Sequence, residues 1–330
     1  MRVVAAVDKF RGTASAAEVA AAIGHACWER DHDCVEIPLA DGGEGLLDVL
    51  GGANRVSTVT GPLGSAVEAP WRMHRGTAII EMALASGLQL AGGAEGNDPM
   101  EATTTGTGEL IDAALSVGAK RIIVGLGGSA TTDGGLGALG AIGSPARVKG
   151  VELLVACDVT TKFTDAANVF GPQKGATPAQ IKMLTRRLEQ LADRYRTEFD
   201  VDVNKIEGSG AAGGIAGMLA ALGGKLIPGF DLVADQLDVY DRVAAADLVI
   251  TGEGHLDAQS FNGKVVGGLA ELGAEYGVSV VAIVGIADDD VRDRIRTWAI
   301  AERFGEQRAL REPLWCVEQI AGELLGEYET

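Results

Sequence analysis

Residues 2–8, RVVAAVD, and residues 247–254, DLVITGEG, are apolar runs that each end in a polar loop. This is the pattern of a strand buried in a parallel sheet. Between them, a capping box at Ser15 opens a helix predicted over 16–30, and a second strand is predicted over 34–41. Strand, helix and strand form one βαβ unit, so the N-terminal region is expected to belong to a parallel α/β sheet.

The same alternation returns at the C-terminal end of the chain. A helix is predicted over 264–276, a strand over 279–285, a short last strand over 299–304 and a closing helix over 313–326. Two N-terminal strands and two or three C-terminal ones would complete one sheet of about five strands. The pattern therefore predicts a doubly wound, Rossmann/flavodoxin-like parallel sheet made from both ends of the chain.

The middle of the chain has its own strands and helices. Residues 67–83 contain two strand-like runs joined by Arg75-Gly76, residues 120–128 a buried strand, and residues 178–197 a long amphipathic helix. This block predicts a second α/β domain inserted into the first. The predicted bounds are 1–55 with 240–330 for the Rossmann-like domain and 56–239 for the inserted domain.

Composition excludes several partners and locations. The chain carries 46 Asp and Glu against 28 Lys and Arg, a formal net charge of −18, so it should repel nucleic acid. Its N-terminus is charged and strand-like, unlike a signal peptide, and no apolar stretch approaches the roughly 18 residues that span a bilayer. The four cysteines lack CxxC spacing, which is typical of reduced thiols. A cytoplasmic globular protein without a membrane partner is expected.

Familiar catalytic motifs are missing from the sequence, including GxxxxGK[ST], GxSxG and HExxH. With four His in all, a His-based metal site or catalytic triad is disfavoured. Two GxGxxG/A patterns occur, at 125–130 and 208–213. The first runs at once into Thr131–Gly135 and the second follows a polar segment, so each is weak evidence for a dinucleotide site.

Four loops rich in Gly, carboxylates and hydroxyls carry more information together. They lie at 8–12, 40–45, 127–135 and 251–257, each directly after a predicted strand. In an open α/β sheet such loops gather at the carboxyl edge, where ligands bind. Carboxylates are ligands for Mg²⁺ and bases for a hydroxyl, while bare N–H groups and Lys or Arg hold phosphate. A ligand site suited to phosphoryl transfer is predicted from the four loops together, although turn geometry alone would also favour Asp and Gly.

Five blocks of this sequence resemble the class I glycerate kinase family almost end to end. These are DKFRGTASA (8–16), PLADGGEG (38–45), GTGEL (106–110) with GGSATTDGG (127–135), FGPQKGA (170–176) and TGEGHLDAQSFNGK (251–264). The resemblance implies a two-domain α/β fold with a Rossmann-like domain. It also implies ATP-dependent phosphorylation of D-glycerate with Mg²⁺, with a preference for the 2-hydroxyl.

The sequence departs from the family pattern at several positions. Lys9 stands where the family usually has Ser, Arg11 where it has Lys, and His255 where Arg is frequent; Arg is not equivalent to Lys at a phosphate. Only about 20 residues separate DGG (133–135) from CDV (157–159), a segment that most relatives have longer. A shortened segment at 136–156 leaves the acceptor open.

From these motifs we assign roles. Asp8, Asp41, Glu253 and Asp257 are expected at one sheet edge, with Asp41 and Asp257 as metal ligands. Ser129, Thr131 and Asp133 would hold the acceptor, Asp133 or Asp158 would take its proton, and Lys174, Lys264 and Arg11 would neutralise phosphoryl charge. The catalytic set is Asp8, Asp133, Asp158, Lys174 and Asp257. The substrate- and phosphate-binding set is Arg11, Asp41, Gly42, Gly43, Glu44, Gly128, Ser129, Thr131, Gln173, Glu253 and Lys264.

Two alternatives to glycerate phosphorylation remain at this point. One is a kinase for a related small hydroxy or sugar acid, with a pocket altered by the short 136–156 segment. The other is a non-catalytic ligand-binding regulator of the same fold. ATP, Mg²⁺ and a small organic acid are the expected ligands, and the sequence leaves a homo-oligomer open.

Overall fold

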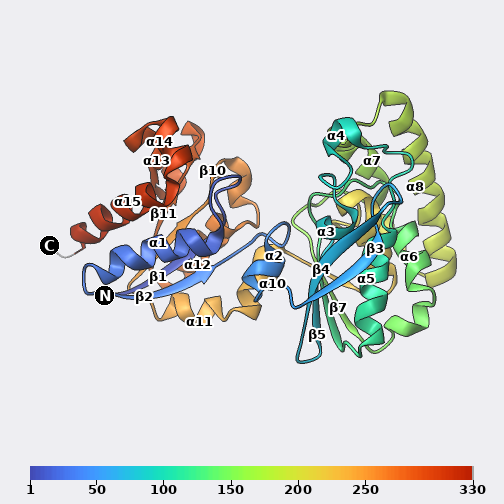
Figure 1. The fold of residues 1–330 in the computed structure, drawn as a ribbon, viewed down its shortest axis with the longest axis horizontal. Helices are drawn as coiled ribbons and strands as arrows, with labels where there is room; N and C mark the ends of the chain where they lie inside the picture. Colours follow the sequence, from blue (N-terminus) through green and yellow to red (C-terminus); the bar gives the residue numbers. More distant parts are fainter. Residues whose placement is uncertain (329–330) are drawn as a thin grey trace. The chain divides into compact units, whose positions relative to one another are not determined.

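The computed structural model describes residues 1–328, which form two compact units (Figure 1). Unit 1 contains Met1–Asp41 and the chain from Gly229 onward, and unit 2 contains Gly42–Pro228. The chain therefore changes units earlier than the predicted 55/56 and 239/240. The short helix α2 (Leu46–Val49) packs on a strand of unit 2, whereas α10 (Gly229–Gln236) packs on a helix of unit 1.

Unit 1 has a five-stranded sheet in the order β13-β11-β9-β1-β2, and every neighbouring pair is parallel. Numbered within the unit, this is the flavodoxin-like order, with its switch point between β1 and β9. The predicted fold class is confirmed. The strands are β1 (Arg2–Val7), β2 (Asp33–Pro38), β9 (Leu248–Gly252), β11 (Ser279–Val284) and β13 (Arg296–Ala299).

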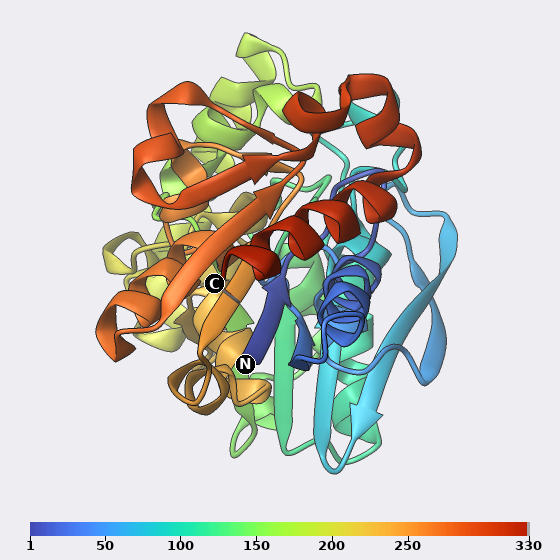
Figure 2. The same ribbon diagram turned by 90° about the vertical axis from the view of Figure 1, so that its left-hand side faces the viewer.

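Helices cover both faces of this sheet (Figure 2). On one face α1 (Ala16–Trp28) and α15 (Pro313–Glu327) lie side by side over Val3, Ala5 and Val7. On the other, α12 (Val265–Tyr276) contributes Val266 to a cluster with Ala282 and Val284. Alternate residues of a strand point to opposite faces, so a strand buried on both sides must be apolar throughout. The central strands of unit 1 are continuous apolar runs in the sequence because helices cover both faces of the sheet.

The ends of unit 1's strands carry small elements that matter for the site. The strand predicted over 299–304 is wrong, because β13 ends at Ala299 and the chain becomes helical. Ile300 and Phe304 sit one helical turn apart and both pack against the core, a helical spacing. The elements are α11 (Val239–Ala244), β10 (His255–Leu256), β12 (Ile286–Ala287), α13 (Ile300–Phe304), α14 (Glu306–Arg311) and the 3-10 helices η6 (Ala258–Phe261) and η7 (Asp289–Arg294).

Unit 2 has a mixed six-stranded sheet in the order β3-β4-β5-β6-β7-β8. The first three strands are antiparallel, and the two strand-like runs predicted on either side of Arg75-Gly76 are neighbours among them; the remaining pairs are parallel. The strands are β3 (Arg55–Thr60), β4 (Ala66–His74), β5 (Thr77–Glu81), β6 (Arg121–Gly125), β7 (Glu152–Ala156) and β8 (Lys225–Ile227).

One hydrophobic core joins the sheet and helices of unit 2, and includes the buried Phe163 and Tyr195. The long helix α8 begins with a Thr177–Gln180 capping box and Pro178 in its first turn, which explains its sharp start. The helices are α3 (Ala83–Ser86), α4 (Gly93–Gly96), α5 (Thr105–Ser116), α6 (Leu136–Ile142), α7 (Ala166–Phe170), α8 (Pro178–Phe199) and α9 (Ile215–Ala221), with 3-10 helices η1 (Pro145–Val148), η2 (Phe163–Asp165), η3 (Pro172–Lys174), η4 (Val203–Lys205) and η5 (Ala211–Gly214).

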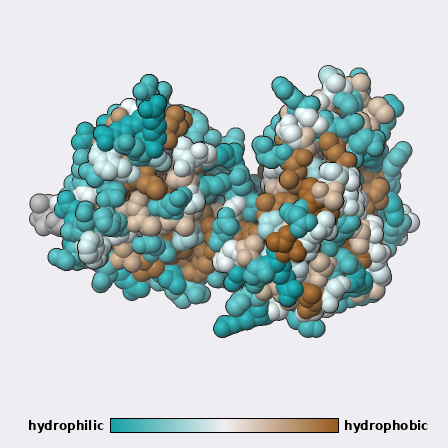
Figure 3. Space-filling model, in the orientation of Figure 1, coloured by the Kyte–Doolittle hydropathy of each residue, from teal (hydrophilic) through white to brown (hydrophobic). Residues whose placement is uncertain are grey.

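The surface drawn in Figure 3 is mostly hydrophilic, with hydrophobic patches on both units. The excess of acidic side chains accounts for much of this polarity. Within residues 1–328, no helix is both long and apolar enough to cross a membrane.

Candidate active site

A cavity of about 600 Å³ lies at the carboxyl edge of the unit 1 sheet. Its walls come from the loops that follow β1, β2, β9, β11 and β13, and the switch point between β1 and β9 lies among them. This is the place where open α/β sheets bind ligands. Six predicted site residues line the cavity: Asp8, Arg11, Asp41, Glu253, Asp257 and Lys264. Lys9 and Gln259, from the same motifs, line it as well.

Two half-buried carboxylates of this cavity, Asp8 and Glu253, have raised pKa values. Burial raises the pKa of Asp8 to about 6, opposed by the charge of Lys9 and reinforced by that of Asp41. Burial likewise raises the pKa of Glu253 to about 7, and the charges of Asp8 and Asp257 act in the same direction. The Oε1 atom of Glu253 is buried and accepts no hydrogen bond from the described residues. Carboxyl groups whose pKa is raised in this way are typical of functional sites.

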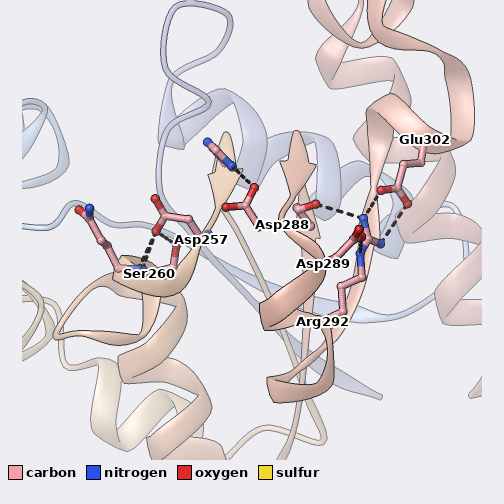
Figure 4. Close-up of polar contacts among 9 residues, drawn as sticks. Asp257, Ser260, Asp288, Asp289, Arg292 and Glu302 are labelled. Carbon is pink, nitrogen blue, oxygen red and sulfur yellow. Dashed lines mark hydrogen bonds and ion pairs between the residues drawn. The ribbon is translucent and has the colours of Figure 1, made fainter.

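Asp257 has a structural task as well as a place in the cavity (Figure 4). Its Oδ1 accepts hydrogen bonds from the N–H groups of Gln259 (2.7 Å) and Ser260 (3.0 Å), which caps η6. The Ser260 hydroxyl donates to the same oxygen at 3.3 Å. All three bonds end on Oδ1, so Oδ2 is left for a ligand.

The neighbouring wall is fixed by an ion-pair network, also drawn in Figure 4. Arg292 pairs with Asp289 (3.1 Å) and Glu302, and donates to the carbonyl of Ala287 at 3.1 Å. The Nε2 atom of His255 lies 2.8 Å from Oδ1 of Asp288. These contacts tie β12 to η7 and α13.

The donor set of the cavity fits a hard divalent cation. Asp8, Asp41 and Glu253 supply only oxygen ligands, the type that Mg²⁺ prefers, and a cation would relieve the burial of the free Glu253 oxygen. The structure does not gather a preformed triad there. Within the described chain, ligand atoms within 4.8 Å of one another occur in threes at His25, Glu29 and Glu318, outside the cavity. Asp41 and Asp257 as metal ligands therefore stay predictions.

In unit 2, Lys174 is buried under the glycine-rich loop at 127–135. Its Nζ donates to Oγ of Ser129 (2.8 Å) and to the carbonyl of Thr131 (2.6 Å), and the residue is 2% exposed. Burial lowers the pKa of Lys174 to about 7, opposed by the charge of Asp133. Lys174 is therefore not exposed to a ligand itself, and it would act by holding Ser129 and Thr131 in place.

Both oxygens of Asp133 accept hydrogen bonds from neighbouring residues of unit 2. Its Oδ2 accepts from the N–H (2.9 Å) and hydroxyl (2.8 Å) of Thr104 and from the N–H of Gly137 (3.1 Å), and its Oδ1 accepts from the N–H of Gly135 (3.1 Å). The carboxylate therefore fixes the start of α6 and links it to α5. Both oxygens are occupied, which favours a positioning role over proton abstraction.

We expect Asp133→Asn to lower the free energy of unfolding by about 1–3 kcal/mol. Asparagine replaces one carboxylate oxygen by an NH₂ group, which cannot accept a hydrogen bond, so at least one of the present donors would lose its acceptor. Thermal or urea unfolding, with Asp165→Asn as a control at another carboxylate of unit 2, measures this. An unchanged stability would contradict the hydrogen-bonding role.

A second glycine segment braces this loop, at 208–214. A Cβ on Gly213 would lie 1.9 Å from the carbonyl oxygen of Thr131, and Gly213 has a φ of +73°, so no other residue fits there. Ala212 also adopts a positive φ of 50°. The pattern that resembled a dinucleotide fingerprint is thus a support for the predicted acceptor loop.

Glu81, a buried carboxylate at the end of β5, was not among the predicted site residues. It accepts hydrogen bonds from the N–H groups of Gly45 (3.2 Å) and Leu47 (3.3 Å), so it holds the glycine loop in place at the start of α2. Burial raises the pKa of Glu81. A single Glu at the end of an apolar run, EMALAS after TAII, was the available signal.

The remaining predicted residues fall into two groups. In unit 2, the bare backbones of Gly43 and Gly127 pack together, since a Cβ on Gly127 would lie 3.0 Å from Cα of Gly43. The loops carrying Gly42, Gly43, Glu44, Gly128, Ser129 and Thr131 therefore share one region.

Asp158 is half-buried after β7, and Gln173 is exposed beside Lys174. Asp41 belongs to unit 1, although its motif continues into unit 2.

Comparison with known proteins identifies the family of this chain. The model of the glycerate kinase family matches residues 3–147 and 144–311. The chain is 40% identical over 331 residues to the glycerate 2-kinase of Escherichia coli, covering 88% of this chain and 87% of that one. It is 39% identical over 330 residues to the glycerate kinase of Bacillus subtilis, covering 88% and 86%.

A solved structure supports the same relationship. The fold superimposes on the crystal structure of a proposed glycerate kinase 2 from Salmonella typhimurium with a TM-score of 0.83 and 34% identity, covering 100% of both chains. The matches span both units and all five motif blocks. The chain belongs to the glycerate kinase family and is a kinase.

Proposed function

We propose that the protein transfers the terminal phosphoryl group of ATP to D-glycerate in a Mg²⁺-dependent reaction, with 2-phosphoglycerate as the product. The observation that carries the proposal is the convergence of half-buried carboxylates and Lys264 in the unit 1 cavity of a glycerate kinase family member. The name of the Escherichia coli relative supports the 2-position.

The unit 1 residues would bind the phosphates. Asp8, Asp41, Glu253 and Asp257 would hold Mg²⁺, which when bound neutralises phosphate oxygens and orients them. Lys264 and Arg11 would add positive charge beside the transferring group. Ionised carboxylates are needed for this task, so Asp8 and Glu253 should lose their protons as the pH rises through about 6 to 7.

The unit 2 residues would bind the acid. Ser129 and Thr131 would donate hydrogen bonds to the acceptor, and Lys174 would hold both in position. We assign the acceptance of the hydroxyl proton to Asp158, because both oxygens of Asp133 already accept hydrogen bonds. Asp133 then acts as a positioning residue.

The proposal predicts D-glycerate-dependent release of ADP from Mg-ATP, abolished by EDTA and restored by Mg²⁺. The measurement uses D-glycerate, L-glycerate, lactate and tartronate as acceptors, and ³¹P NMR identifies the phosphorylated hydroxyl. A 3-phosphorylated product would overturn the regiochemistry alone. Absence of turnover with every acid, in a protein that binds ATP, would favour a ligand-binding regulator.

One observation favours a second acceptor. The shortened segment after Gly135 is filled by α6 and η1 before β7 begins at Glu152. If this segment selects the acid, a related small hydroxy or sugar acid would be phosphorylated faster than D-glycerate in the same assay.

A further inference from the structure

The unit 1 cavity changes character along the sheet edge, and the change follows the strand order. The residues that line it after β2, β1 and β9 are largely charged or polar, from Asp41 through Asp8 to Asp257. Those after β11 and β13 are mostly apolar. They are Gly285, Ile286, Ile300, Ala301, Glu306, Ala309 and Leu310.

The apolar end offers aliphatic surface to a ligand. Ile286 is 47% exposed and Leu310 is 66% exposed, although both line a concave site. Exposed aliphatic groups in a cavity gain free energy when a ligand covers them, roughly 25 cal/mol for each Å² removed from water. This end of the cavity therefore favours a flat, weakly hydrated group.

The wall that carries these side chains is held by main-chain hydrogen bonds. The N–H of Ile286 donates to the carbonyl of Gly254 at 3.1 Å, and the N–H of Ala301 donates to the carbonyl of Gly285 at 3.1 Å. A Cβ on Gly285 would lie 2.3 Å from the Gly254 oxygen, so only glycine permits this approach. The apolar surface is thus built into the fold.

We infer that this apolar end binds the nucleobase of the phosphoryl donor, with Ile286, Ala301 and Leu310 against the ring. The inference rests on the proposed function. A nucleoside triphosphate is a polyanion at one end and a flat heterocycle at the other, which matches the two ends of the cavity in order. The cavity volume of about 600 Å³ is within the range for such ligands.

Glu306 is the ionisable side chain at this end, and its carboxylate accepts hydrogen bonds only. It suits a base with an exocyclic amino group, which adenine has and hypoxanthine lacks. The unaltered protein should therefore bind ADP more tightly than IDP, and Glu306→Ala should reduce that difference.

The test measures the Kd of Mg-ADP and of magnesium tripolyphosphate, which has no base, by titration calorimetry. The double variant Ile286→Ser/Leu310→Ser should weaken ADP binding by about tenfold or more and leave tripolyphosphate binding unchanged. The KM for D-glycerate should also stay unchanged. Ala301→Trp, which fills the same end, should weaken ADP binding further.

Leu63→Ser is the matched control, since Leu63 is a 41% exposed leucine of unit 2 outside the cavity. Unchanged ADP affinity in the folded double variant would place the base elsewhere and overturn the inference. Equal weakening of ADP and tripolyphosphate would also overturn it. A lack of ATP-dependent turnover in the unaltered protein would instead refute the proposed function.

Discussion

Lys174→Met is expected to lower kcat/KM for D-glycerate by about 10²–10³-fold, the usual cost of losing one organising donor in an active site. The amine is 2% exposed and is bonded to Ser129 and to the carbonyl of Thr131, so its loss would free the acceptor loop. Methionine keeps the length of the side chain and its burial. Steady-state kinetics, with thermal unfolding to confirm folding, measures the effect.

The pH profile separates a charge effect from a packing effect. The pKa of Lys174 is about 7, so the amine is charged below that pH and neutral above it. If the charge matters, the activity of the unaltered protein falls as the pH rises through about 7, and the Met variant lacks this limb. Lys182→Met, at an exposed lysine of α8, is the control. A Met variant with full activity would refute the role of Lys174.

Glu253→Gln should make the protein more stable and almost inactive at about pH 8. Burial raises the folded-state pKa of Glu253 to about 7, from the 4.5 that is usual for a glutamate. The folded state therefore holds this proton more tightly than the unfolded chain, and stability is lost as the pH rises from about 4 through 7. Glutamine removes that loss, a gain on the order of 2 kcal/mol in the absence of Mg²⁺.

The sign of this effect makes the prediction specific. Near pH 4, where the carboxyl is protonated in both states, the Gln variant and the unaltered protein should unfold at similar temperatures. Mg²⁺ should stabilise the unaltered protein more than the variant, because the variant lacks one oxygen ligand. Glu271→Gln, at an exposed position of α12, is the control. A variant that is less stable than the unaltered protein at high pH would show that ionised Glu253 does not destabilise the fold. A fully active variant would show that its carboxylate is not needed for the reaction.

The sequence by itself determined most of the strands and helices of the fold. Continuous apolar runs predicted parallel strands such as β1 and β9, because a strand covered on both faces must be apolar at every position. The capping box at Ser15 belongs to the same class of signal, since it depends on two side chains three residues apart. Local patterns such as these were found again as elements of the structure. The motif blocks identified the family.

Only the tertiary structure decided which polar groups are already occupied. The motif of Asp133 predicted a base for the acceptor hydroxyl, and the structure adds that its carboxylate accepts four hydrogen bonds, from Thr104, Gly135 and Gly137. Lys174 was predicted to neutralise phosphoryl charge, and only the structure shows that it is buried and that its pKa is lowered. Glu81 carries no motif, yet it holds the loop that does. Burial and hydrogen-bond partners arise from long-range packing, so no local pattern of residues can specify them.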